Sequence, residues 1–294
     1  MIDIFKRLLK KESEEAVVTS DAEAEKDIEE PGTHDHQPDT EPPKEAQEKG
    51  EPEGEWVKTG IEGFDSLLER GIPRGAAILI AGGPGSGKTI FCLQTLNYAA
   101  THGEKCLYMT FEEGEEKLRK HMHDFGWNPE ELEKKGLLVI KRFDPFDVTI
   151  SVEAMLEKAR GELSIEITPV LIPDDFKPDR VVVDSLSAIA AGFIGSERSY
   201  RIYIEQLFRY FERMGATSFL ITEIGSTPST ISKSGVEEFL ADGVVVLYNV
   251  RDGNIRQNTI EVLKLRGTGF EKKIVPMGII AGQGIVVYPE QEIF

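Results

Sequence analysis

Short apolar runs alternate with amphipathic stretches over most of the chain from Trp56 onward. The apolar runs have the length of buried strands, and the stretches between them repeat hydrophobic residues with the period of a helix. We therefore expect strands at Ala77–Ala81, Cys106–Phe111, Leu137–Lys141, Val181–Asp184 and Ser218–Thr222. Helices are expected from the glycine-rich loop through Tyr98, and over Glu112–Phe125, Ser151–Leu163 and Arg198–Met214. This alternation predicts a parallel sheet covered by helices on both faces.

After Asp242 the pattern changes, and strand follows strand. Gly243–Val250 and Thr259–Arg266 flank the segment RDGNIRQ, whose Asp-Gly pair is typical of a turn, and a last strand is expected at Ile285–Tyr288. The predicted fold class is α/β: a mostly parallel sheet flanked by helices, with C-terminal antiparallel strands. One domain over residues 56–294 accounts for these elements.

Residues 1–55 differ in composition from the rest of the chain. They carry seven Lys or Arg against 18 Asp or Glu, a net charge of −11, which leaves −7 for residues 56–294. The stretch 12–55 is interrupted by proline and contains no Phe, Tyr or Trp. Such a stretch buries too little apolar surface to offset the entropy lost on ordering, so we expect an acidic disordered tail.

Residues 1–11 are an exception within this tail. On a helix, one side is apolar and the other is basic, with Met1, Ile2, Ile4, Phe5, Leu8 and Leu9 on the apolar side. A basic amphipathic helix can dock on a membrane surface or in the groove of a partner protein. Isolated helices this short are marginal in water, so an inert terminus is the alternative.

Charge and composition exclude several classes of protein. A net charge of −18, without a basic stretch interleaved with aromatic residues, argues against nucleic-acid binding. The sequence contains no apolar run of the roughly 18–20 residues that a membrane-spanning helix needs, and Lys6 and Arg7 interrupt the first apolar cluster, which argues against a signal peptide. Cys92 and Cys106 are expected to be small buried residues. We expect a cytoplasmic protein, with peripheral membrane association open through residues 1–11.

The segment from Gly82 to Thr89 fits the pattern of a phosphate-binding loop, G-x-x-x-x-G-K-[ST]. It follows a predicted strand and opens a predicted helix, in the order Gly82, Gly83, Pro84, Gly85, Ser86, Gly87, Lys88 and Thr89. Backbone N–H groups of such a loop surround the phosphates, and the helix N-terminus favours negative charge. We expect Lys88 to reach the β- and γ-phosphates of ATP and the Thr89 hydroxyl to ligate Mg²⁺.

Two further acidic positions fall at the ends of predicted strands. Asp184 ends an apolar strand and, downstream of a phosphate-binding loop, is expected to be the Walker B carboxylate that helps hold Mg²⁺. Glu112 and Glu113 follow the strand at Cys106–Phe111, and strand alternation predicts that only one of them faces the γ-phosphate. Alternatively, both are solvated acids in the first turn of a helix.

Seven segments taken together carry a family resemblance that covers Trp56 to about Pro289. They are VKTGIEGFDSLLERGIPRG, GGPGSGKT, YMTFEE, FGW, RVVVDSLSAI, GVEEFLADGVVVLYNV and IEVLKLRGTGF. In this order they resemble the KaiC-like branch of the RecA superfamily, and more narrowly its single-domain archaeal members.

The resemblance implies ATP hydrolysis in a homo-oligomeric, hexamer-type ring. It implies that Glu112 is the catalytic base, with Glu113 beside it, and that Lys264 and Arg266 reach the nucleotide of a neighbouring subunit. A cation supplied by the neighbouring subunit makes chemical sense, because it neutralises charge on the phosphoryl group during its transfer. Residue spacing alone favours the alternative that Lys264 and Arg266 are basic residues on an exposed strand face, and only the resemblance overturns it.

Departures from the family pattern limit what the resemblance implies. The clock protein that names the family has two tandem ATPase domains and phosphorylates itself, whereas this chain has a single phosphate-binding loop. We therefore do not expect clock function, and the resemblance does not by itself imply autophosphorylation. The alternative to an ATPase is an ATP-dependent switch or scaffold that hydrolyses slowly and recruits a partner or membrane through the tail. A recombinase or helicase is disfavoured by the acidic charge.

Overall fold

The structure is a computed structural model that describes residues 54–159, 176–224, 235–252 and 254–293. Residues 1–53 of the tail, which include the predicted helix at 1–11, lie outside the described residues, as does the end of the helix predicted at Ser151–Leu163. These predictions therefore stay predictions.

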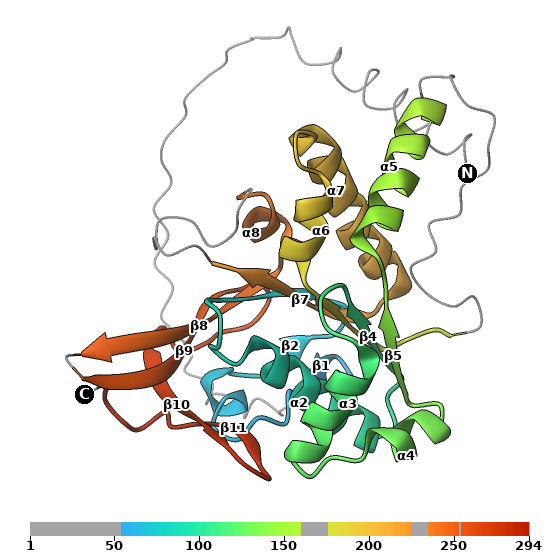
Figure 1. The fold of residues 1–294 in the computed structure, drawn as a ribbon. Helices are drawn as coiled ribbons and strands as arrows, with labels where there is room; N and C mark the ends of the chain where they lie inside the picture. The colour runs from blue at the N-terminus through green and yellow to red at the C-terminus, as the bar shows by residue number, and fades with distance from the viewer. Residues whose placement is uncertain (1–53, 160–175, 225–234, 253, 294) are drawn as a thin grey trace, which may run out of the picture. The chain divides into compact units, whose positions relative to one another are not determined.

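The described residues form a nine-stranded sheet in the order β11-β10-β9-β8-β3-β7-β6-β4-β5 (Figure 1). The strands from β8 to β5 in this order run parallel: β3 (Ala77–Gly82), β4 (Cys106–Thr110), β5 (Leu138–Arg142), β6 (Arg180–Asp184), β7 (Thr217–Glu223) and β8 (Gly243–Asp252). Antiparallel pairing continues the sheet through β9 (Ile255–Leu265), β10 (Ile274–Ile280) and β11 (Gly284–Val287). A separate small sheet pairs β1 (Trp56–Val57) with β2 (Ile72–Pro73). The predicted fold class is confirmed.

Helices cover both faces of this sheet (Figure 1). One face carries α2 (Lys88–Thr101), α3 (Glu115–Asp124) and α4 (Pro129–Lys134), and the other carries α5 (Pro145–Ala159), α6 (Leu186–Gly192) and α7 (Glu197–Met214). Strand side chains alternate between the faces. Ile78 and Ile80 pack in the core that contains Phe91 of α2, whereas Leu79 packs with Leu207 of α7. Short helices η1 (Asp65–Leu67) and α8 (Glu237–Leu240) complete the described elements, and none of the described helices is long and apolar enough to cross a membrane.

Helix boundaries differ from the predicted ones where a side chain fixes the local turn. The helix expected from Glu112 begins at Glu115, because the Thr110 hydroxyl accepts hydrogen bonds from the backbone N–H groups of Glu112 and Glu113 and holds them in a separate turn. The helix expected from Ser151 begins at Pro145, preceded by Asp144, whose carboxylate accepts from the N–H of Phe146.

The predicted hairpin is confirmed, but its strands are longer than predicted. They continue to Asp252 and Ile255, into the segment expected as a turn. Cross-strand pairs such as Val250 with Gln257 explain the extension, because they continue the ladder beyond the apolar core. Strand β10 and helices α4, α6 and α8 are elements that the sequence pattern missed.

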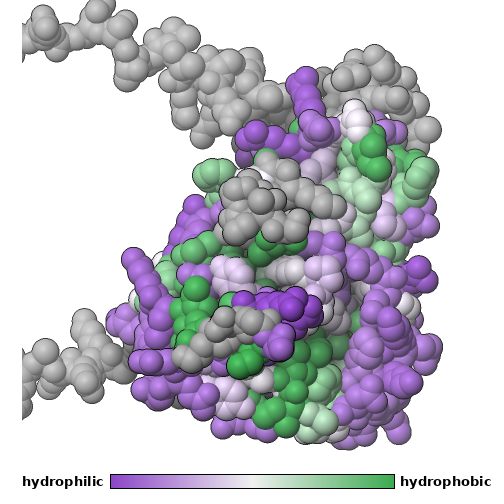
Figure 2. All heavy atoms as spheres, turned by 60° about the vertical axis from the view of Figure 1, so that its left-hand side comes forward, coloured by the Kyte–Doolittle hydropathy of each residue, from purple (hydrophilic) through white to green (hydrophobic). Residues whose placement is uncertain are grey.

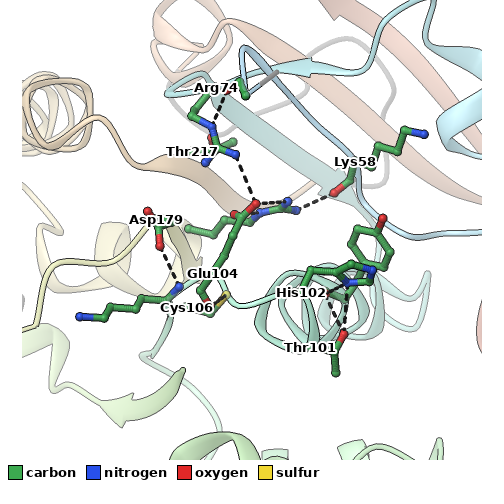
Figure 3. Close-up of polar contacts among 12 residues, drawn as sticks. Lys58, Arg74, Thr101, His102, Glu104, Cys106, Asp179 and Thr217 are labelled. Carbon is green, nitrogen blue, oxygen red and sulfur yellow. Dashed lines mark hydrogen bonds and ion pairs between the residues drawn. The ribbon is translucent and has the colours of Figure 1, made fainter. Parts of the chain in front are cut away.

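A buried arginine ties the segment before β2 to the amino edge of the sheet. Arg180, 2% exposed, donates from Nε and Nη2 to the two carboxylate oxygens of Glu104 at 2.7 and 3.1 Å, and from Nη1 to the carbonyl of Lys58 at 2.6 Å. Figure 3 shows this cluster around Glu104, which Arg74 also contacts at 3.3 Å. Burial raises the pKa of Glu104, but the hydrogen bonds and charge of Arg180 outweigh it and hold that pKa below its usual value.

The antiparallel strands expose apolar side chains. Figure 2 brings this side forward and shows hydrophobic atoms at the surface among hydrophilic ones. Exposed apolar residues of β9 and β10 are Ile255, Leu263, Ile274 and Ile280.

Candidate nucleotide-binding site

The candidate site lies at the carboxyl edge of the parallel strands. Gly82, Asp184 and Glu223 end neighbouring strands β3, β6 and β7 at this edge. The loop from β3 to α2 has left-handed backbone at Gly85 (φ +73°) and Gly87 (φ +101°), which L side chains rarely adopt. No side chain in the described residues caps α2, so its first N–H groups stay available to an anion.

Lys88 is held inside this loop. Its Nζ donates to the carbonyls of Gly82 at 2.8 Å and Gly83 at 2.9 Å, which uses two of the three N–H donors of the ammonium group. Burial lowers the pKa of Lys88, while the nearby carboxylates of Glu223, Asp184 and Glu112 act against this shift. Because both bonds go to neutral carbonyls, the ammonium group can be drawn to a negatively charged group such as a polyphosphate.

Thr89 and Asp184 come together as predicted. The Thr89 hydroxyl donates to Asp184 Oδ2 at 3.2 Å, and the phenol of Tyr108 donates to the same oxygen at 2.5 Å. Burial raises the pKa of Asp184 to about 6. A hydroxyl and a carboxylate are the oxygen donors that suit Mg²⁺, which takes its other ligands from water and phosphates, so this pair fits a nucleotide-bound magnesium ion.

The two adjacent glutamates have different surroundings. Glu112 accepts a hydrogen bond from the hydroxyl of Ser185, the residue after Asp184, and lies near enough to influence the pKa of Lys88. Ser185 also caps α6, because its Oγ accepts from the N–H of Ala188 at 3.1 Å. Glu113 instead pairs with Lys117 at 2.6 Å, and its other carboxylate oxygen lies 3.5 Å from Nδ1 of His121. Only Glu112 is therefore tied to the strand end that carries Asp184.

A cavity of about 390 Å³ lies beside the loop and is lined by both the phosphate-binding segment and more distant elements. Gly85, Gly87, Lys88, Thr89 and Ile90 line one part of it, and Glu113, His121, Asp124, Phe125 and Ile279 line the other. Its volume falls in the range of small-molecule sites. The pattern of the sequence did not single out Ser185, Tyr108 or the residues contributed by α3 and β10. For Ser185, its position directly after Asp184 was the one feature of the sequence that could have indicated a place at this site.

Lys264 and Arg266 are not near this site within one chain. Lys264 pairs with Val244 of β8, and its Nζ donates to the carbonyls of Glu238 and Ala241 at 2.9 and 2.5 Å. Arg266 contacts Asp242 at 3.4 Å, and the N–H of Asp242 bonds to the carbonyl of Ala77, at the start of β3. Because the loop follows the other end of β3, the two basic residues lie toward the opposite edge of the sheet.

Comparisons with known proteins agree with this geometry. The model of the KaiC ATPase family matches residues 57–292. The circadian clock protein KaiC3 of Synechocystis is 37% identical over 80% of this chain, and the circadian clock oscillator protein KaiC of Thermosynechococcus vestitus is 32% identical over 82%. The chain spans 46% of the length of each of these two relatives.

A solved structure extends the likeness to the fold. The crystal structure of a KaiC-like protein from the archaeon Pyrococcus horikoshii has 34% sequence identity and a TM-score of 0.65, and the match covers 80% of this chain and 99% of that one. The family model spans most of the chain, and the loop 82–89 and Asp184 lie at the same edge of the sheet. The chain therefore belongs to the KaiC-like ATPases of the RecA superfamily.

Proposed function

We propose that this chain binds Mg-ATP at the loop 82–89 and hydrolyses it, with Glu112 as the general base. The observation that carries the proposal is the different setting of the two glutamates. Glu112 is held by Ser185 beside Asp184, whereas Glu113 is paired with Lys117. A general base must lie within reach of the water that attacks the γ-phosphate, and that water lies beyond the phosphates that Lys88 contacts.

Residues Thr89 and Asp184 would hold Mg²⁺, which supplies charge neutralisation on the β- and γ-phosphates. Lys88 would exchange its bonds to the Gly82 and Gly83 carbonyls for phosphate oxygens, aided by the free N–H groups of α2. The cavity lined by His121, Asp124 and Phe125 would take the nucleoside part. Each of these roles uses groups that already meet at one edge of the sheet.

Self-association is the second part of the proposal. Lys264 and Arg266 lie too far from the loop of their own chain to act there, so a role on the nucleotide requires a neighbouring copy. The exposed apolar residues of β9 and β10 offer such a copy apolar area to bury. A head-to-tail contact of this kind closes into a ring when its rotation allows.

The glutamate assignment is tested by Glu112→Gln and its matched control Glu113→Gln. The amide keeps the shape of the side chain but cannot accept a proton, so Glu112→Gln should bind labelled ATP normally and lose phosphate release by about 10²–10⁴-fold. Glu113→Gln should retain most of the activity. A loss below about tenfold for Glu112→Gln, or a larger loss for Glu113→Gln, contradicts the assignment.

A second function is favoured by the amphipathic pattern of residues 1–11. We propose that this segment docks on an anionic membrane surface or in a protein groove, independently of ATP hydrolysis, on a tether of about 33–40 Å reach. Deletion of residues 1–55 should leave the ATPase rate unchanged and abolish recovery with anionic vesicles or with a co-purifying protein. Phe5→Glu should have the same effect, because it places a charge within the apolar side. If the unmodified chain binds neither anionic vesicles nor a co-purifying protein, this proposal is wrong.

A further inference from the structure

A tyrosine that the proposed chemistry does not use contacts the Walker B carboxylate. Tyr108 of β4 is fully buried, and its hydroxyl donates to Asp184 Oδ2 at 2.5 Å. Thr89 donates to the same oxygen at 3.2 Å. Asp184 Oδ2 thus joins two hydroxyl groups that come from different elements, β4 and α2.

The sheet register explains why these groups meet. Tyr108 pairs with Val182, and Thr110 pairs with Asp184, in the parallel ladder of β4 and β6. Residues two apart on a strand share a face, so Tyr108 and Asp184 both lie on the face that α2 covers. The phenol ring packs in the apolar core with Val182, and a phenylalanine ring would fill the same space. The hydroxyl, rather than the ring, is therefore the feature that needs a separate explanation.

A hydroxyl has one donor and two acceptor lone pairs. When Thr89 donates its proton to Asp184 Oδ2, the direction of that bond sets where the lone pairs of Thr89 point. The position of Oδ2 therefore controls how Thr89 presents itself to a cation. A carboxylate with a second, short hydrogen bond from a buried phenol has less freedom to rotate away from this orientation.

We propose that Tyr108 is a positioning residue of the magnesium site: its hydroxyl fixes the Asp184 carboxylate, and through it the Thr89 hydroxyl, in the orientation that binds Mg²⁺ with the nucleotide. This inference rests on the proposed binding of Mg-nucleotide at Thr89 and Asp184. Groups that orient metal ligands in this way typically contribute 10–100-fold to metal affinity. Loss of the Tyr108 hydroxyl should weaken Mg²⁺ binding and leave metal-free nucleotide binding unchanged, because Tyr108 is not among the residues that line the cavity.

The test compares Mg²⁺ dependence with nucleotide binding that needs no metal. Fluorescence of the labelled nucleotide mant-ADP gives its affinity in EDTA, and a Mg²⁺ titration at fixed mant-ADP gives the half-saturating Mg²⁺ concentration. Tyr108→Phe should raise the half-saturating concentration by about 10–100-fold and change the affinity in EDTA by less than about twofold. Tyr200→Phe is the matched control, because it removes a buried tyrosine–carboxylate hydrogen bond of 2.7 Å, to Glu237, away from the loop.

The outcomes separate this inference from the function on which it rests. If Mg²⁺ does not affect mant-ADP binding by the unmodified chain, the proposed magnesium site fails and the role of Tyr108 fails with it. If the unmodified chain responds to Mg²⁺ and Tyr108→Phe has the same half-saturating concentration, the magnesium site stands and the role of Tyr108 is wrong. The same conclusion follows if Tyr200→Phe raises the half-saturating concentration as much as Tyr108→Phe does. A parallel loss in EDTA and in Mg²⁺ also overturns it, since that result indicates a general structural effect of the hydroxyl.

Discussion

Replacement of Arg180 by methionine should strongly destabilise the domain, because Arg180 is a buried charged residue with three hydrogen bonds. The side chain is 2% exposed and makes two hydrogen bonds to Glu104 and one to the carbonyl of Lys58. Methionine keeps much of the apolar stem, so the loss comes mainly from the guanidinium group. The variant leaves a carboxylate and a backbone carbonyl without their buried donors.

The magnitude follows from these contacts. Breaking a buried ion pair by removing one partner costs about 3–5 kcal/mol, most of it from the charge left behind. Glu104 is 20% exposed and keeps its contact with Arg74, so water and Arg74 offset part of this cost and place it near the lower end of the range. The orphaned Lys58 carbonyl adds about 1 kcal/mol. We expect a total loss of about 3–4 kcal/mol, a large share of the 5–15 kcal/mol typical of a domain.

Urea unfolding followed by circular dichroism measures this loss. Arg74→Met is the matched control, because Arg74 contacts the same carboxylate at 3.3 Å but is 37% exposed, and its loss should cost less than about 1 kcal/mol. Arg180→Met combined with Glu104→Gln should recover part of the stability, since the second change removes the orphaned charge. Equal losses for Arg180→Met and Arg74→Met would refute the argument that burial sets the value of this ion pair.

Three other predictions follow from the site and its support. Lys88→Ala should abolish binding of labelled ATP, because it removes the cation held in the loop; unchanged affinity would contradict the phosphate-binding role. The stabilising effect of Glu104, measured as the difference in unfolding free energy from Glu104→Gln, should be full above the ordinary pKa of 4.5 and fall as the pH drops through the lowered pKa of the folded state. A difference that does not change with pH would contradict the lowered pKa. Glu112→Gln and Lys264→Ala should each be inactive alone, while an equimolar mixture regains about a quarter of the ATPase rate if subunits mix at random, because Lys264 of one chain then serves Glu112 of its neighbour. A mixture as inactive as its components would refute action in trans.

The sequence by itself determined the parts of this protein that depend on neighbouring residues. The glycines and Lys88 of the loop follow one another along the chain, and the apolar run before Asp184 identifies a buried strand, so both were located from local pattern alone. The order of strands and helices followed in the same way from hydrophobic periodicity. The helix α4 was missed because its six residues are too few for a period to be visible, and β10 was missed because Pro276 and Gly278 interrupt its apolar run.

Only the tertiary structure gave a physical difference between Glu112 and Glu113. Strand pairing brings Ser185, 73 positions along the chain, to Glu112, whereas Glu113 pairs with Lys117 only four residues away. The bond from Tyr108 to Asp184 joins residues 76 positions apart, and no local pattern predicts it. The placement of Lys264 and Arg266 toward the other edge of the sheet likewise depends on the pairing of β9 with β8. Such contacts are decided by strand register, which packing of the whole core fixes and which a single stretch of sequence does not contain.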